Sequence, residues 1–132
     1  MTNKENKGTP INWTEEKINN LWDYYSVTPP YNEIYFSKVF GSKIIESFGE
    51  SFSKQISVLD FGCGPGYIFE HMKARGVKWK YTGVDSSPES ISTLLENNEG
   101  HEIFEGCYAS TKDIIDKKFD LIIMIEVIEH LT

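Results

Sequence analysis

The chain has 132 residues, 39% of them apolar and 25% charged, which suits one folded domain with a core of its own. No apolar run approaches the roughly 20 residues of a membrane-spanning helix, and the polar segment 1–10 lacks the apolar centre of a signal peptide. The net charge is −7 and no basic cluster is longer than Lys117-Lys118, so a basic face that could displace counterions from nucleic acid is not evident. We therefore expect a cytoplasmic protein that acts on a small molecule, without a nucleic-acid or membrane partner.

The first part of the chain predicts two helices. Thr14 can cap a helix whose apolar residues recur at helical spacing, and Pro29-Pro30 would end it. A second helix is expected over 32–48, with Gly49 as its stop. Aromatic side chains are frequent in both helices, a pattern that is more typical of a core than of a cofactor site.

A glycine-rich turn follows these helices. The apolar run 56–61 is cut off by Gly62, Gly64 and Gly66, and an amphipathic segment follows over 65–75. This pattern predicts a strand, a tight turn and a helix. Glycines allow positive φ and a close approach of a ligand, and a helix start offers unpaired N–H groups. The turn could therefore hold a ligand, or it could be only a sharp connection.

The rest of the chain predicts an alternation of strands and helices. A second strand is expected over 79–84, and Ser87 can cap a helix with Pro88 at its first position and Gly100 at its end. A third strand is expected over 101–104, then a polar turn over 106–110, a short helical piece over 112–116 and a fourth strand over 119–125. This order predicts an α/β fold, a Rossmann-like, doubly wound, mainly parallel sheet with helices on both faces. Ligands of such sheets lie at the carboxyl ends of the strands.

Two positions separate the nucleotide ligands that such a turn could bind. The dinucleotide fingerprint requires a third glycine where Tyr67 stands, which disfavours an NAD-binding domain. Asp85 follows the glycine turn by about 20 positions, the separation at which an acid accepts hydrogen bonds from ribose hydroxyls. The alternative for Asp85 is an ordinary helix-capping acid.

Three stretches together resemble the motifs of the class I S-adenosylmethionine-dependent methyltransferases. They are Asp60-Phe61-Gly62-Cys63-Gly64-Pro65-Gly66, Gly83-Val84-Asp85-Ser86, and the segment 119–131, which ends Glu126-Val127-Ile128-Glu129-His130-Leu131. The resemblance implies methyl transfer from S-adenosylmethionine to a small-molecule acceptor, on oxygen or nitrogen, with S-adenosylhomocysteine as product. It implies these cofactor-binding residues: Asp60, Gly62, Cys63, Gly64, Gly66, Tyr67, Asp85, Ser86, Cys107, Tyr108 and Glu126.

The resemblance also implies a role for several of these residues. Asp60 and the glycine backbone would hold the methionine end of the cofactor, and Asp85 would bind the ribose. Ser86, Cys107 and Tyr108 would lie beside the adenine, although many members have an acid in place of Cys107. The N-terminal helices, from Trp22 to Tyr35, would form a lid over the ligand.

The segment 126–130 allows two interpretations. Glu126, Glu129 and His130 bring two carboxylates and an imidazole together, which resembles the metal motif of the ubiquinone-pathway O-methyltransferases and the small-RNA 2′-O-methyltransferases. They could instead pair with neighbouring side chains, and a metal is not expected. If the acceptor is a hydroxyl, Glu126 or His130 could take its proton as a catalytic base.

The resemblance implies that the sheet continues beyond the fourth strand. We expect a flexible N-terminus over 1–12, a helical lid over 13–50 and an incomplete S-adenosylmethionine-binding domain over 51–132. Such a fragment could be inactive by itself and could self-associate through the exposed edge of its fourth strand. The alternative function is a noncatalytic S-adenosylmethionine-binding or interaction module.

Overall fold

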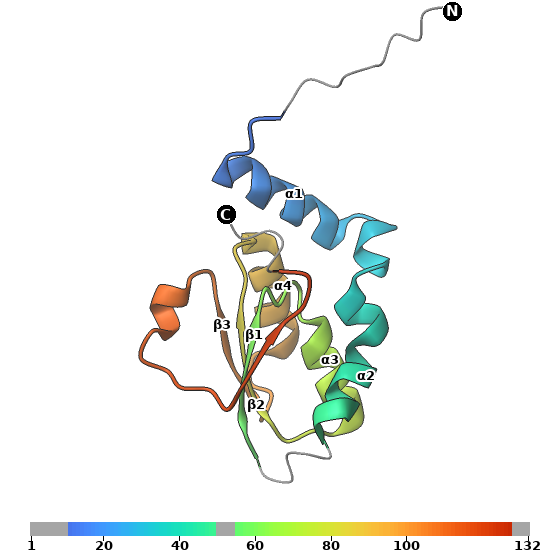
Figure 1. The fold of residues 1–132 in the computed structure, drawn as a ribbon, viewed down its shortest axis with the longest axis vertical. Helices are drawn as coiled ribbons and strands as arrows, with labels where there is room; N and C mark the ends of the chain where they lie inside the picture. Colours follow the sequence, from blue (N-terminus) through green and yellow to red (C-terminus); the bar gives the residue numbers. More distant parts are fainter. Residues whose placement is uncertain (1–10, 50–54, 128–132) are drawn as a thin grey trace, which may run out of the picture.

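A computed structural model describes residues 11–49 and 55–127, and its ribbon is drawn in Figure 1. The described residues form four strands, four α-helices and two short 3-10 helices, which are labelled η. In chain order they are α1 (Glu15–Val27), η1 (Tyr31–Glu33), α2 (Phe36–Gly49), β1 (Ser57–Phe61), α3 (Tyr67–Arg75), β2 (Lys80–Val84), α4 (Pro88–Asn98), β3 (Phe104–Tyr108), η2 (Thr111–Ile114) and β4 (Leu121–Met124).

The four strands form one parallel sheet in the order β3-β2-β1-β4. Phe61 at the end of β1 pairs with Val84 of β2 and Met124 of β4, and Val84 in turn pairs with Tyr108 of β3. All four carboxyl ends therefore meet at one edge of the sheet. The predicted Rossmann-like parallel sheet is confirmed.

The main core lies between the sheet and helices α2, α3 and α4, which cover the same face (Figure 1). Phe69, Met72, Tyr81 and Leu94 are fully buried there. Each such side chain contributes about 1.5–3 kcal/mol of burial free energy relative to exposure.

We predicted helices on both faces of the sheet. The face opposite α2, α3 and α4 is covered less extensively by the described residues. Within the described ranges it carries the short helix η2, whose Ile114 packs against Leu59 and Val84. On β4, Ile122 and Met124 remain 57% and 38% exposed. The unbroken apolar run of β4 thus includes side chains that the described residues leave open to solvent.

Two of the three glycines in the turn have different surroundings: Gly66 lies against another helix, and Gly64 lies below open space. Gly66 caps α3 in the left-handed conformation (φ 96°), and a Cβ there would lie 2.3 Å from Leu94 Cδ1. This glycine therefore lets α3 and α4 pack closely. A Cβ on Gly64 would meet no heavy atom within 4 Å, so the space above Gly64 is open.

Helix α2 begins four residues later than the predicted range 32–48. The chain first forms η1, and the backbone at Ile34 (φ −103°, ψ 6°) leaves the α-helical region. The carbonyl of Asn32 accepts a hydrogen bond of 2.7 Å from the hydroxyl of Tyr67 on α3. In an α-helix that carbonyl would accept from Phe36, so the tertiary contact competes with the helix at this point.

A histidine fastens α2 to α3. His71 Nε2 lies 2.7 Å from the carbonyl oxygen of Lys38, and because a carbonyl only accepts, Nε2 carries the proton. The imidazole fits against Gly41, where a Cβ would lie 2.4 Å from His71 Cδ2.

The third strand lies at 104–108, not at the predicted 101–104. Tyr81 pairs with Phe104 but Thr82 pairs with Gly106, so Glu105 is an extra residue in an irregular register. Residues 106–108, predicted as a polar turn, are strand residues. A bulge that contains a glycine has little of the apolar alternation by which a strand is recognised in a sequence.

Candidate functional site

A cavity of about 600 Å³ lies at the carboxyl ends of the strands. This volume is within the range of small-molecule sites. The residues that line it come from α1, the region where α2 begins, the ends of β1 and β2, the glycine turn, the first turns of α3 and α4, and the segments that follow β2, β3 and β4. They are Ile18, Trp22, Tyr35, Ser37, Phe61, Gly62, Cys63, Gly64, Tyr67, Val84, Asp85, Ser86, Ser90, Ala109, Ser110, Thr111, Ile125, Glu126 and Val127.

The glycine turn forms the floor of this cavity. Gly62 and Gly64 have positive φ of 75° and 52°. The N–H groups of Gly62 and Cys63 both donate to the carbonyl of Val84, at 2.7 and 3.0 Å. These bonds fix the turn against the end of β2, which leaves the open space above Gly64 for a ligand.

Asp85 holds the glycine turn from the end of β2. Its Oδ2 accepts from the N–H of Gly64 and its Oδ1 from the N–H of Ser87, each at 2.8 Å. Burial raises the pKa of Asp85, these two hydrogen bonds oppose the rise, and the nearby charge of Asp23 adds to it. Ser87, not Asp85, caps α4 with its side chain. Because a carboxylate has about four acceptor positions, Asp85 retains acceptors for ligand hydroxyls.

Asp60 lies below the cavity and is absent from its lining. Its side chain is 3% exposed, and its Oδ2 accepts a hydrogen bond of 2.8 Å from the hydroxyl of Tyr81. Burial raises the pKa of Asp60 to about 7, against the opposing effect of the Tyr81 hydrogen bond. In parallel strands, Asp60 and Tyr81 share the helix-covered face of the sheet. The structure therefore does not bring this carboxylate to the expected methionine contact.

Cys107 and Tyr108 also lie outside the lining of the cavity. Cys107 is buried beside Gly83 of β2, and its Sγ lies 3.6 Å from the carbonyl of Ile91. The hydroxyl of Tyr108 accepts from Lys117 Nζ at 3.2 Å. Because β3 extends to Tyr108, the next three residues, Ala109, Ser110 and Thr111, reach the cavity in their place.

Both cysteines are free and buried. Burial raises the pKa of Cys107 to about 11, and burial followed by the charge of Asp60 raises that of Cys63. Both are therefore protonated thiols at neutral pH. Cys63 lines the cavity as a small neutral side chain of the turn.

Aromatic side chains from the N-terminal segment line the cavity opposite the glycine turn. Trp22 of α1 and Tyr35 both reach it. The rings of Tyr35 and Tyr67 have centroids 5.4 Å apart. Burial raises the pKa of Tyr35 to about 12, with smaller contributions from Tyr67 and Asp85, so its hydroxyl stays protonated.

The remaining predicted residues fall into three groups. Tyr67, Ser86 and Glu126 line the cavity, and Glu126 has a positive φ of 53°, unusual for a residue with a Cβ. Gly66 does not line the cavity, since its place is the contact with Leu94. Glu129 and His130 lie outside the described residues. Within residues 11–49 and 55–127, no group of three side chains could hold a metal ion.

Sequence reasoning missed several lining residues, among them Ala109, Ser110, Thr111 and Ser37. The first three follow directly from β3, so a correct position for that strand would have found them. Ser37 carries no signal in the sequence, because it reaches the cavity only through the packing of α2 onto α3.

Comparison with known proteins identifies the family. Residues 31–132 match a family model described as a methyltransferase domain. The ubiquinone biosynthesis O-methyltransferase of Rickettsia bellii is 32% identical over 78 residues, which are 58% of this chain and 32% of the relative. A putative methyltransferase of Mycobacterium tuberculosis, Rv1506c, is 43% identical over 44 residues, which are 33% of this chain and 26% of the relative. The chain spans about a third of the length of the curated relatives that it matches.

Solved structures confirm the fold. The plantazolicin methyltransferase BamL, crystallised with a desmethylPZN analog and S-adenosylhomocysteine, matches with a TM-score of 0.52 and 23% identity over 81% of this chain and 47% of its own. The kinase-methyltransferase WbdD matches with a TM-score of 0.52 and 20% identity over 70% of this chain and 21% of its own. In the part of the chain that the structure describes, no helix has the length and apolar character to cross a membrane. The match of residues 31–132 to the methyltransferase model shows that the chain belongs to the class I S-adenosylmethionine-dependent methyltransferase family.

Proposed function

We propose that the protein binds S-adenosylmethionine in the cavity and transfers its methyl group to a small-molecule acceptor. The observation that carries this proposal is the placement of the Asp85 carboxylate beside the Gly62-Gly64 backbone, at the floor of a cavity of about 600 Å³. An acid for the ribose and an open glycine backbone for the amino-acid end are the two features that the donor requires.

Each part of the donor has a matching part of the cavity. Asp85 accepts from the ribose hydroxyls, and Ser86 with Ala109–Thr111 borders the adenine. The backbone of Gly62, Cys63 and Gly64 lies along the methionine moiety. Asp60 supports this floor from below through Tyr81 and does not touch the ligand.

S-Adenosylmethionine supplies a methyl group that its positively charged sulfur already activates. The residues of the chain then contribute mainly alignment, by holding the acceptor in line with that methyl group. Glu126 lies in the cavity lining, where it can accept the proton of a hydroxyl acceptor. His130 is the second proposed base.

The proposed acceptor is a small molecule methylated on oxygen. The relatives named ubiquinone biosynthesis O-methyltransferases support oxygen over nitrogen as the methylated atom. The described lining contains no lysine, arginine or histidine, and the chain carries a net charge of −7, which disfavours a nucleic-acid substrate.

Three further predictions belong to this proposal. A divalent metal held by Glu126, Glu129 and His130 stays an alternative, since only Glu126 lies within the described residues. Self-association would use β4, which pairs only with β1 among the described strands. A cytoplasmic location is supported by two cysteines that are free in the structure.

The test is calorimetric titration of the chain with S-adenosylhomocysteine, beside NADH. We expect saturable binding of S-adenosylhomocysteine alone, with an affinity that is strongly reduced but still measurable in Asp85→Ala. Asp116→Ala is the matched control, because it removes an exposed acid outside the cavity. Tighter binding of NADH, or undiminished binding of S-adenosylhomocysteine by Asp85→Ala, would contradict the proposal.

Methyl transfer itself needs a second assay. Incubation with donor labelled on the methyl group and a set of phenolic acceptors should give labelled product. Saturable cofactor binding by a longer protein that methylates no acceptor would favour the noncatalytic S-adenosylmethionine-binding module.

A further inference from the structure

Asp23 of α1 is hydrogen bonded to the residue that holds Asp85, although Asp23 does not line the cavity. The hydroxyl of Ser87 donates to Asp23 Oδ1. The backbone N–H of the same serine donates to Asp85 Oδ1 at 2.8 Å. One serine therefore stands between the two carboxylates and contacts both.

The orientation of the Ser87 hydroxyl depends on Asp23. Its oxygen accepts from the N–H of Ser90 at 3.1 Å, so its single hydrogen is free to point at Asp23. Ser87 is fully buried, so water cannot easily replace the carboxylate. Removal of Asp23 would leave a buried hydroxyl without this acceptor, and an unsatisfied buried group is costly.

The same bond attaches α1 to the cofactor site. Asp23 follows Trp22, which lines the cavity together with Ile18 from the same helix. The hydroxyl of Ser26 donates to the carbonyl of Asp23 at 2.8 Å, within α1. Helix α1 also packs against α4, whose first turn Ser87 caps. A movement of α1 at Asp23 would therefore shift Ser87. That shift would disturb the cap of α4 and the hydrogen bond that Asp85 accepts from the N–H of Ser87.

We propose, building on the function proposed above, that Asp23 is a positioning residue for the ribose. Through Ser87 it fixes the Asp85 carboxylate in the orientation that accepts from the ribose hydroxyls. It thereby couples the placement of α1 over the cavity to the binding of the cofactor.

The experiment compares two ligands, S-adenosylhomocysteine and its 2′,3′-dideoxyribose analogue, by calorimetric titration. Asp23→Ala should weaken the binding of S-adenosylhomocysteine about five- to tenfold, the effect of losing one hydrogen bond of ordinary net strength. It should weaken the binding of the analogue by less than about twofold, because the analogue has no ribose hydroxyls to donate to Asp85. A general loss of α1 contacts would weaken both ligands equally.

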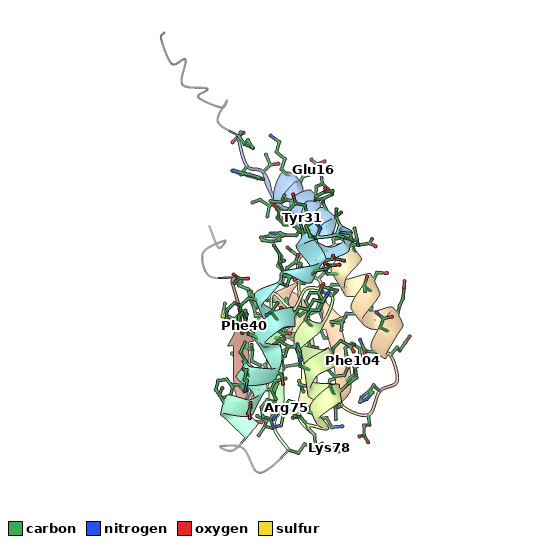
Figure 2. All side chains as sticks on the ribbon, turned by 90° about the vertical axis from the view of Figure 1, so that its right-hand side faces the viewer. Glu16, Tyr31, Phe40, Arg75, Lys78 and Phe104 are labelled. Atoms are coloured by element: carbon green, nitrogen blue, oxygen red, sulfur yellow. The ribbon has the colours of Figure 1, made fainter. Side chains whose placement is uncertain are left out.

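Two variants and a double mutant sharpen the test. Asp23→Asn keeps an oxygen that accepts from Ser87 and should retain affinity within about twofold. Glu16→Ala is the control, since it removes an exposed acid near the start of α1 (Figure 2) and should leave both affinities unchanged. In the Asp85→Ala background, Asp23→Ala should cause no further loss.

Several results would overturn this role. They are equal weakening of both ligands, additive losses in the double mutant, or an Asn variant as weak as the Ala variant. Unchanged affinity in Asp23→Ala, beside saturable binding by the wild type, would reject the role of Asp23 and leave the proposed function intact. No binding by the wild type would reject the proposed function and this role together.

Discussion

Replacement of Gly66 by alanine should destabilise the fold by about 2–5 kcal/mol. A left-handed conformation costs an L-residue roughly 1–2 kcal/mol, and Gly66 has φ 96°. The new Cβ would lie 2.3 Å from Leu94 Cδ1, and because Leu94 is fully buried it has little room to move. Overpacking of this kind costs about 1–3 kcal/mol. Since domains of this size are stable by only about 5–15 kcal/mol, the loss should be large.

Gly76→Ala separates the two contributions. Gly76 ends the same helix at φ 66°, but a Cβ there meets no heavy atom within 4 Å. It should therefore cost only the backbone contribution, about 1–2 kcal/mol. Urea unfolding followed by circular dichroism measures both losses. If the two variants lose equal stability, the steric contact with Leu94 does not matter and the packing role of Gly66 is wrong.

Three further outcomes are expected. Gly64→Ala should lower the free energy of unfolding by only about 1–2 kcal/mol, yet prevent binding of S-adenosylhomocysteine in calorimetry, because its Cβ enters the open cavity. Because the pKa of Asp60 rises from 3.8 to about 7 on folding, the folded state binds its proton more tightly than the unfolded chain. The free energy of unfolding should then fall by up to about 4 kcal/mol as the pH rises from about 4 to about 7. Asp60→Asn can still accept the hydrogen bond from Tyr81 but does not titrate. In this variant the free energy of unfolding by urea should depend less on pH over that range. His71→Ala should cost about 0.5–1.5 kcal/mol in thermal or urea unfolding, since it removes the exposed hydrogen bond to Lys38; no change in stability would show that this bond contributes nothing.

Local signals predicted those parts of the fold that depend on neighbouring residues. Thr14 and Ser87 cap their helices as expected, with side chains that accept from Lys17 and Ser90. The glycine turn and strands β1, β2 and β4 follow from apolar runs and breakers. Asp85 could be predicted because its separation from the glycine turn is the length of one helix, α3, and one strand, β2.

The errors fall where distant contacts decide the structure. The start of α2 depends on a hydrogen bond from Tyr67, 35 positions away from Asn32. The position of β3 depends on its register with β2, and the shift at Gly106 moved Cys107 and Tyr108 out of the site. The sequence motif contains Asp60, but only the structure shows its carboxylate turned away from the cavity.

The contact between His71 and Lys38 has an evolutionary consequence. Because the imidazole donates to a backbone carbonyl, the side chain at position 38 can vary without loss of the bond. Position 41 has no such freedom while residue 71 is histidine, because any Cβ there would overlap the ring. Homologous sequences should therefore exchange residues 41 and 71 together, and a larger residue at 41 should accompany a smaller one at 71.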